Sequence, residues 1–318
     1  MFVFEAEQRQ KNVPTLEFPH PTRISDGYFA VKPLVHDWFI ATGVFEGARL
    51  RRFLLGDYTL FVAMMHSHSD RERLERLTRY YILWFAMEEY CESLWSAEPG
   101  RADRFLRGFV AHLETGVAPE ASDPWLDAFV GAVEGLGLNA RQRELLATWM
   151  IDWLRGEQRV AAYRGEPREE FMLDRFHTIG QHLAFRLFTQ YELGLDLPPA
   201  VSERPDMVEF VETLVRAGSW HSDVLTLEAE EARGELVNTV HVIARRPGSD
   251  RERGIRDIVR RFHEDCRLAS AQAERLLKSD WGDTPREDVA AYVDALFGTS
   301  AGFLSWNQIT DRYVVPLQ

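Results

Sequence analysis

Apolar residues recur every three or four positions from about residue 34 almost to the C-terminus, which is the spacing of α-helices. Alternation with a period of two, the pattern of a half-buried strand, is scarcely visible. Pro14, Pro19 and Pro21 break any helix near the start, so we expect residues 1–33 to form an irregular segment. The pattern predicts an all-α protein, with one large helical bundle over residues 34–318.

The individual helices are separated by proline and glycine pairs such as Pro99-Gly100 and Pro247-Gly248. The helix at 70–97 follows Ser69-Asp70, a good N-cap pair, and is apolar nearly all round at its centre. It is therefore expected to lie buried in the bundle. We expect helices at about 70–97, 101–115, 123–136, 139–163, 168–193, 206–218, 220–244, 252–279 and 286–307.

The composition is that of a globular protein and argues against nucleic-acid-binding, disulfide-rich and membrane proteins. Hydrophobic residues make up 45% and charged residues 27% of the 318 residues, which is ordinary for a globular protein. The net charge, 37 − 50 = −13, argues against a nucleic-acid partner. Two cysteines, Cys91 and Cys266, exclude a disulfide scaffold and a cysteine-based zinc site. No apolar run reaches the roughly 18 residues of a membrane helix, and no signal peptide is evident, so we expect a cytoplasmic protein.

The first candidate chemistry lies in the predicted helix 70–97. Glu88 and Glu92 are four positions apart, so their carboxylates share one face of the helix. Trp84 lies one turn before Glu88 on this otherwise apolar face. Carboxylates in such surroundings are costly unless they are paired or bound to a cation. The alternative is a helix edge with both glutamates in water.

A second acidic cluster lies in the predicted helix 220–244. Ser222, Thr226 and Glu230 follow one another at intervals of four, so three oxygen-bearing side chains form one stripe. Hydroxyl and carboxylate oxygens are hard ligands, suited to Mg²⁺. The alternative is that Ser222 or Asp223 is an N-cap, followed by a solvated acidic first turn.

Five segments of the chain resemble, in order, the motifs of bacterial class I terpene synthases. Residues 88–92, EEYCE, stand where that family has DDxxD or DDxxE. Residues 171–180, FMLDRFHTIG, are similar to its Tyr-x-x-x-Arg-Arg-x-Thr-x-Gly motif. Residues 222–230, SDVLTLEAE, are similar to its second metal motif, (N/D)Dxx(S/T)xxx(K)E. The fourth segment, residues 233–240, RGELVNTV, is similar to the small linker and Asn-Leu-Val-like run that follows the second metal motif. Residues 306–313 hold a tryptophan followed by a terminal Arg-Tyr pair, as in the family. The resemblance covers nearly the whole chain.

The resemblance implies a terpene synthase bundle around a central apolar cavity. The implied activity is Mg²⁺-dependent ionisation of a C15 or C20 allylic isoprenoid diphosphate and cyclisation of the carbocation to a terpene hydrocarbon or alcohol. Arg312 and Tyr313 would bind diphosphate oxygens as the site closes. The family often dimerises, which leaves a homodimer open. Three Mg²⁺ ions would be bound with the diphosphate, and the implied metal ligands are Glu88, Glu92, Ser222, Thr226 and Glu230.

The apolar tail of the substrate would lie in a dry pocket, where aromatic faces steady the carbocation. Each aromatic candidate for this lining is about as readily explained by core packing. The predicted substrate-binding residues are Arg175, Gly180, Trp84, Phe85, Phe185 and Trp306.

Several positions depart from the family pattern, and all of them handle charge. Glutamates 88 and 89 replace aspartates, Ser222 replaces Asn or Asp, and Ala229 replaces a lysine. Phe176 aligns with the diphosphate-sensing arginine, while Arg175 lies about 100° around the helix from it. Three readings stay open: an active cyclase with an altered metal site, a synthase with another isoprenoid diphosphate or a simple linear or alcohol product, and a binding protein without ionisation chemistry. The surviving acidic residues favour activity.

Overall fold

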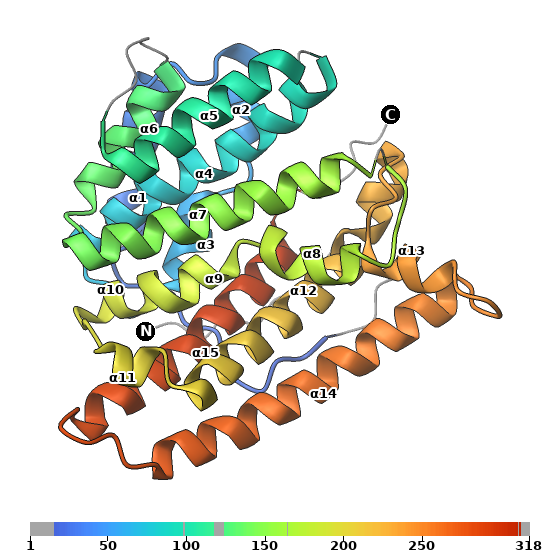
Figure 1. Cartoon of the computed structure of the whole chain (residues 1–318). Helices are drawn as coiled ribbons and strands as arrows, with labels where there is room; N and C mark the ends of the chain where they lie inside the picture. Colours follow the sequence, from blue (N-terminus) through green and yellow to red (C-terminus); the bar gives the residue numbers. More distant parts are fainter. Residues whose placement is uncertain (1–15, 98, 118–123, 164, 311, 313–318) are drawn as a thin grey trace.

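The computed structural model describes residues 16–97, 99–117, 124–163, 165–310 and 312, and all the regular structure in these residues is helical (Figure 1). The all-α prediction is therefore confirmed. The elements are α1 (Tyr28–Ala41), α2 (Gly47–Leu54), α3 (Tyr58–Met65), α4 (Arg71–Ala97), α5 (Pro99–Thr115), α6 (Pro124–Gly135), α7 (Ala140–Ala161), α8 (Phe171–Thr178), α9 (Gln181–Leu183), a π-helical turn (Ala184–Phe188), α10 (Thr189–Leu193), α11 (Pro199–Ser202), α12 (Pro205–Arg233), α13 (Thr239–Ala244), α14 (Arg251–Lys278) and α15 (Arg286–Ile309).

Helix α4 is the central element of the N-terminal half, as its apolar sequence predicts. Asp70 caps it by accepting a hydrogen bond from the Arg73 backbone N–H at 2.8 Å. Helices α1, α3, α5 and α6 pack around it, and Figure 1 shows α1, α2, α4, α5 and α6 gathered in the upper part of the molecule. The fully buried Tyr80 of α4 lies at the centre of this core.

The C-terminal half is built on α12, which packs along α14 and α15. Figure 1 shows α12 and α15 side by side, with α14 along the outer side of α12. A second core fills this region, with Phe210 of α12 and Tyr292 of α15 fully buried. Helix α15 also packs against α3, which joins the two halves. Among the helices described, none combines the length and apolar character that crossing a bilayer requires.

The prediction of separate helices at 206–218 and 220–244 is wrong. One helix, α12, runs through Gly218 and Trp220 and ends at Gly234, which has a left-handed φ of 77°. The N-cap interpretation of Ser222 and Asp223 is wrong for the same reason, since both lie in the middle of α12. Gly218 does not break the helix; a Cβ there would lie 2.2 Å from Oε1 of Gln181.

The prediction of one continuous helix over 168–193 is also wrong. The chain breaks at Gly180, whose φ is 71°, and continues through a π-helical turn before α10. The turn leaves the Phe185 carbonyl oxygen free to accept a hydrogen bond from the Tyr292 hydroxyl at 2.9 Å. This broken segment passes between α7 and α12.

The boundary of the irregular N-terminal segment lies earlier than expected. Residues 16–27 have no helix, but α1 begins at Tyr28 and contains Pro33. Pro33 lies in the second turn of α1, where it removes the backbone donor that would bond to the Phe29 carbonyl oxygen, and the helix continues through it to Ala41. The other helices that we predicted from residue 70 onward agree with the structure to within a few residues.

Candidate active site

The stripe of oxygen-bearing side chains on α12 is formed as predicted. Ser222 and Thr226 are 5% and 4% exposed, and the Thr226 hydroxyl donates to the Ser222 carbonyl oxygen at 3.0 Å. Glu230, one turn further on, accepts a hydrogen bond from Nδ2 of Asn238 at 2.8 Å. Burial, with a smaller contribution from the charge of Asp223, raises the pKa of Glu230 to about 7. The carboxylate is thus held where negative charge is poorly stabilised.

Arg175 reaches this stripe from α8. Its Nε donates to Oδ1 of Asp223 at 2.6 Å, and its Nη2 donates to the Ser222 hydroxyl at 3.2 Å. The other Asp223 oxygen accepts hydrogen bonds from the backbone N–H and the hydroxyl of Thr239, at 3.0 and 2.7 Å. Asp223 therefore joins α8, α12 and α13, and Arg175 supplies a cation directly beside the proposed metal ligands.

Phe176 points elsewhere, although it aligns with the family's sensing arginine. Its ring packs edge-on against Trp220, with centroids 5.2 Å apart. Phe176 thus fills apolar space next to α12, and Arg175 is the residue of this pair that contacts the oxygen stripe.

The first acidic motif lies near the C-terminal end of α15. Oε2 of Glu88 accepts a hydrogen bond from Nη2 of Arg312 at 2.7 Å, and the guanidinium lies 4.7 Å from the centre of the Phe85 ring. Glu89 is turned toward α2, where Arg49 and Arg52 bind its carboxylate at 3.3 and 3.1 Å. Of this adjacent pair, Glu88 is therefore the residue that meets Arg312. The side chain of Glu92 and the whole of Tyr313 lie outside the described residues.

Helix α15 connects the two motif helices at one end of the bundle. Nε2 of Gln308 lies 3.4 Å from Nε2 of His221, the residue before Ser222 on α12. Four residues later, Arg312 pairs with Glu88 of α4. The α8–α9 segment makes a second connection, because Arg175 contacts α12 while Gly180 lies against the Trp84 ring of α4. These contacts link Glu88 of α4 to Ser222 of α12 through α15 and the α8–α9 segment.

Three of the four aromatic candidates lie close to this end. The Phe85 and Trp306 rings are 5.8 Å apart, and both pack on Phe61 of α3. The Trp306 indole N–H is anchored by the Gly56 carbonyl oxygen at 3.1 Å. Trp84, 8% exposed, packs edge-on against Trp153 and lies next to Gly180.

The fourth aromatic candidate, Phe185, lies apart from the others. It belongs to the second core, together with Phe210 and Tyr292. Its position is explained by packing between the π-helical turn, α12 and α15.

The oxygen donors of the α12 stripe fit a hard cation whose remaining coordination positions are filled by oxygens of a bound ligand. Among the residues that the structure describes, no three His, Cys, Asp or Glu side chains come together as a metal site. The α12 stripe instead offers two hydroxyls and one carboxylate whose pKa is raised by burial. A divalent cation would stabilise the ionised form of Glu230, and oxygens are the donors that Mg²⁺ prefers.

Asn238 is a site residue that the sequence reasoning missed. Its side-chain oxygen accepts the Val240 backbone N–H at 2.8 Å and so caps α13. Its amide nitrogen donates both to Glu230 and to the Asp223 carbonyl oxygen, each at 2.8 Å. The available signal was an asparagine directly before a short apolar run, which is typical of an N-cap.

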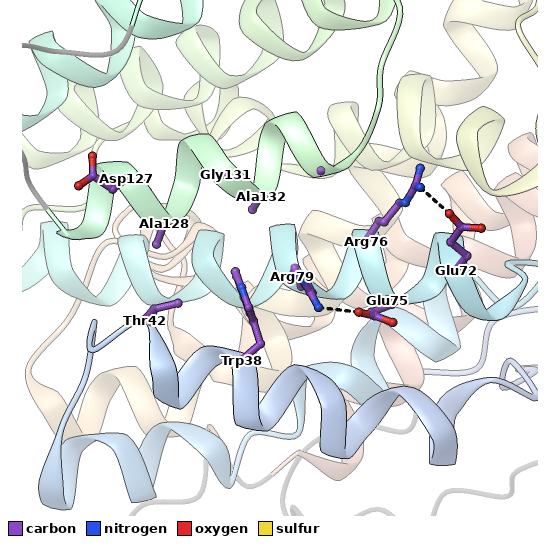
Figure 2. Close-up of a pocket in the computed structure, with 11 residues that line it drawn as sticks. Trp38, Thr42, Glu72, Glu75, Arg76, Arg79, Asp127, Ala128, Gly131 and Ala132 are labelled. Carbon is purple, nitrogen blue, oxygen red and sulfur yellow. Dashed lines mark hydrogen bonds and ion pairs between the residues drawn. The ribbon is translucent and has the colours of Figure 1, made fainter.

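A separate cleft of about 480 Å³ lies between α1, α4 and α6 (Figure 2). Its α4 wall carries Arg76 and Arg79, and Figure 2 shows their ion pairs with Glu72 and Glu75. These residues lie roughly opposite Glu88 on the helical wheel of α4. The cleft is therefore distinct from the candidate active site.

Comparison with known proteins gives consistent matches. A family model described as terpene synthase family 2, C-terminal metal binding, matches residues 64–267. Sesquiterpene synthase 3 of Postia placenta is 23% identical over 301 residues, covering 93% of this chain and 81% of the relative. Isoafricanol synthase of Streptomyces violaceusniger is 23% identical, with 93% and 83% covered. The crystal structure of an α-eudesmol synthase superposes with a TM-score of 0.80 at 18% identity, covering 92% of this chain and 98% of that one.

Proposed function

The chain belongs to terpene synthase family 2, and on that premise we propose that it is a Mg²⁺-dependent class I terpene synthase. Its substrate would be an allylic isoprenoid diphosphate of C15 or C20 length, cyclised to a terpene hydrocarbon or alcohol with release of diphosphate. The name of the Postia placenta relative, a sesquiterpene synthase, favours the C15 substrate.

The observation that carries the proposal is the convergence of α4, α8, α12 and α15 at one end of the bundle. Glu88 faces Arg312 there, and Arg175 lies on the Ser222 stripe of α12. A diphosphate needs both cations and hard metal ligands from opposing walls, and this arrangement offers both. Glu88, Ser222, Thr226 and Glu230 would hold the metal, and Arg175 and Arg312 would bind diphosphate oxygens.

Each group of residues then has a defined part in ionisation. Bound Mg²⁺ would supply electrostatic stabilisation of the departing diphosphate. Arg312, held over Phe85, presents a planar fork of donors to oxygens that gain negative charge as the C–O bond breaks. Phe61, Phe85 and Trp306 provide apolar and aromatic surface that excludes water from the carbocation.

Arg175 is also a candidate to replace the positive charges that the family pattern has at positions 176 and 229. Phe176 removes the sensing arginine of the family pattern, and Ala229 removes a lysine. Arg175 contacts Ser222 and Asp223 from the preceding position of the same helix. These contacts support Arg175 as the substitute for the missing positive charge.

The direct test is turnover of defined substrates. Purified protein is incubated with geranyl, farnesyl, geranylgeranyl and geranylfarnesyl diphosphates, with and without Mg²⁺. Diphosphate release is measured alongside gas chromatography of the products. We expect a Mg²⁺-dependent terpene from at least one substrate. No metal-dependent product and no diphosphate release from any of the four would refute the proposal.

The neighbouring glutamates provide a matched pair of variants. Glu88→Gln should lower turnover about a hundredfold or more, because it weakens a ligand that acts on developing charge. Glu89→Gln is the control, since Arg49 and Arg52 bind Glu89 on the side of α2. It should stay within a few-fold of the wild type. Equal effects of the two substitutions would contradict the role given to Glu88.

A second candidate function is isoprenoid binding without catalysis, favoured by Ser222, Ala229 and Phe176 at charge-handling positions. It predicts that an isoprenoid diphosphate raises the melting temperature without being consumed, and that Mg²⁺ changes little. The same incubations decide between the two functions.

A further inference from the structure

A fully buried chain of polar side chains lies below the aromatic residues of the site. Nε2 of His66, at the C-terminal end of α3, lies 3.0 Å from the Tyr81 hydroxyl of α4. Its Nδ1 lies 3.4 Å from Oε1 of Glu192 in α10. The His66 and Glu192 side chains are both 0% exposed. We refer to Tyr81, His66 and Glu192 as the Tyr81 relay.

In a neutral imidazole one ring nitrogen carries the proton and the other a lone pair. With the proton on Nδ1, directed at the Glu192 carboxylate, Nε2 accepts a hydrogen bond from the Tyr81 hydroxyl. This is the tautomer that the relay requires. The second Glu192 oxygen accepts the His68 backbone N–H at 3.1 Å. With its proton donated to His66, the Tyr81 oxygen keeps its own lone pairs for another partner.

Tyr81 lies two turns of α4 before Glu88, the residue of this helix that is proposed to bind metal. Tyr81, Phe85 and Glu88 follow at intervals of four and three, so they share one face of α4. Seven residues correspond to about 10 Å along a helix. The Tyr81 ring is parallel to Trp84 at 6.0 Å and edge-on to Phe61 at 5.5 Å. Tyr81 thus belongs to the same aromatic cluster as Phe85 and Trp306, since all three pack on Phe61.

Burying three polar groups at this place is costly, although Glu192 also accepts the His68 backbone N–H and so helps to hold the connection between α3 and α4. An apolar trio of similar volume would pack without the desolvation cost of a buried carboxylate. Burial, together with the charge of Glu192, raises the pKa of Tyr81 well above its ordinary value, so the phenol stays protonated. A neutral phenol backed by an imidazole and a carboxylate can pass a proton inward from an acid that reaches its oxygen.

We propose, on the basis of the proposed terpene synthase function, that Tyr81 is the catalytic base that terminates the carbocation, with His66 and Glu192 as the positioning residues behind it. The proton removed from the cation passes to the Tyr81 oxygen while the phenol proton passes to Nε2 of His66. Glu192 then stabilises the imidazolium as a buried ion pair.

The step balances in atoms and charge. A C–H bond next to the cationic carbon breaks, and its electron pair forms the C=C bond of the product. The positive charge moves from the carbocation to His66, beside the negative Glu192. The extra proton leaves to water when the site opens, which restores the neutral imidazole. No oxidant or reductant takes part.

Tyr80 makes a matched control available. It is the adjacent residue, is fully buried like Tyr81, and donates its hydroxyl to Sδ of Met150 at 2.8 Å instead of to His66. Tyr80→Phe and Tyr81→Phe each remove one buried hydroxyl and keep the ring. Glu192→Gln is the second test variant, because it keeps shape and removes the charge behind His66.

The experiment measures two quantities for wild type and the three variants, with Mg²⁺ and the substrate that the wild type consumes best. Diphosphate release reports ionisation, and gas chromatography reports how the cation is terminated. In Tyr81→Phe and Glu192→Gln, diphosphate release should stay within about threefold of the wild type, while the share of the main product falls about tenfold or more. Tyr80→Phe should keep the wild-type product profile.

The outcomes separate this inference from the proposed function. Wild-type turnover combined with an unchanged product profile in both Tyr81→Phe and Glu192→Gln would overturn the relay and leave the proposed function standing. A loss of melting temperature without a change in product shares would show a purely structural network, and would also overturn it. No diphosphate release by the wild type from any substrate would refute the proposed function, and the relay with it.

Discussion

Among the residues that the structure describes, the carboxylate of Glu230 has no cation paired directly with it. Arg175 contacts the adjacent Asp223 and Ser222, and Asn238 offers Glu230 a neutral donor. The ordinary pKa of 4.5 is therefore raised to about 7. The residue that is proposed to bind Mg²⁺ is thus one whose ionised form is poorly stabilised by the protein alone.

Glu230→Gln should stabilise the metal-free protein at pH 8. Because the pKa of Glu230 is raised in the folded state, its contribution to stability is fully present below pH 4.5 and is lost as the pH rises to about 7. A neutral amide avoids this loss, which we expect to amount to about 1–3 kcal/mol. Urea unfolding of both proteins without metal, at pH 5 and pH 8, measures the difference. A variant that is less stable than the wild type at pH 8 would contradict this account of Glu230.

Arg175→Ala should be strongly destabilising. It leaves Asp223, whose side chain is 3% exposed, with the neutral Thr239 donors, and breaking such a buried pair costs about 3–5 kcal/mol. Arg246→Ala is the control, because Arg246 and Glu169 are 38% and 60% exposed and a surface pair contributes about 0–1 kcal/mol. Chemical denaturation of both variants tests the contrast. Similar losses in the two would show that Asp223 does not depend on Arg175.

At the scale of elements, the sequence predicted which residues share a face better than it predicted where helices end. Ser222, Thr226 and Glu230 form one stripe in any helix that contains them, so the wrong boundary at residue 220 did not affect the stripe. The predicted boundary is wrong because α12 continues through Gly218, which packs closely against Gln181. That contact joins residues far apart in the sequence and has no local signal.

The break at Gly180 was missed for a related reason. A glycine within a helical pattern is tolerated, so the pattern offered no reason to end the helix there. In the structure Gly180 has a φ of 71°, and the Trp84 ring leaves no room for a side chain. The resemblance identified Gly180 as a site residue, but only the tertiary contact explains why the helix must break at this position.

Gly180→Ala should therefore cost more stability than the left-handed backbone alone explains. The backbone strain of a non-glycine residue is about 1–2 kcal/mol, and a Cβ at Gly180 would also lie 2.7 Å from the Trp84 ring. Gly234 has a φ of 77°, and a Cβ there would meet none of the described residues within 4 Å, so Gly234→Ala isolates the strain. The difference between the two variants in urea unfolding measures the collision. Equal losses would mean that Trp84 moves aside freely.

At the scale of the whole molecule, the candidate site depends on chain segments that are distant in sequence. Glu88 and Arg312 are separated by 224 positions, and His221 and Gln308 by 87. The order of the motifs predicted that these segments belong to one site, but not which atoms meet. That Glu89 turns to α2 while Glu88 turns to Arg312 could not be predicted, because the two positions are adjacent and carry the same side chain.

Because the walls of the site come from separate helices, Mg²⁺ and pyrophosphate together should stabilise the fold more than either does alone. A ligand at a hundred times its Kd adds about 2.7 kcal/mol, which corresponds to a rise of a few degrees in melting temperature for a chain of this size. Differential scanning calorimetry of the wild type with each component and with both measures the effect.

Arg312→Ala should lose most of the joint effect, because Arg312 is proposed to bind diphosphate oxygens from the end of α15. Arg260→Ala, which removes an exposed partner of Glu264 on α14, should keep it. If Arg312→Ala retained the full joint stabilisation, diphosphate would bind without the C-terminal end of α15, and the two stripes would not belong to one site.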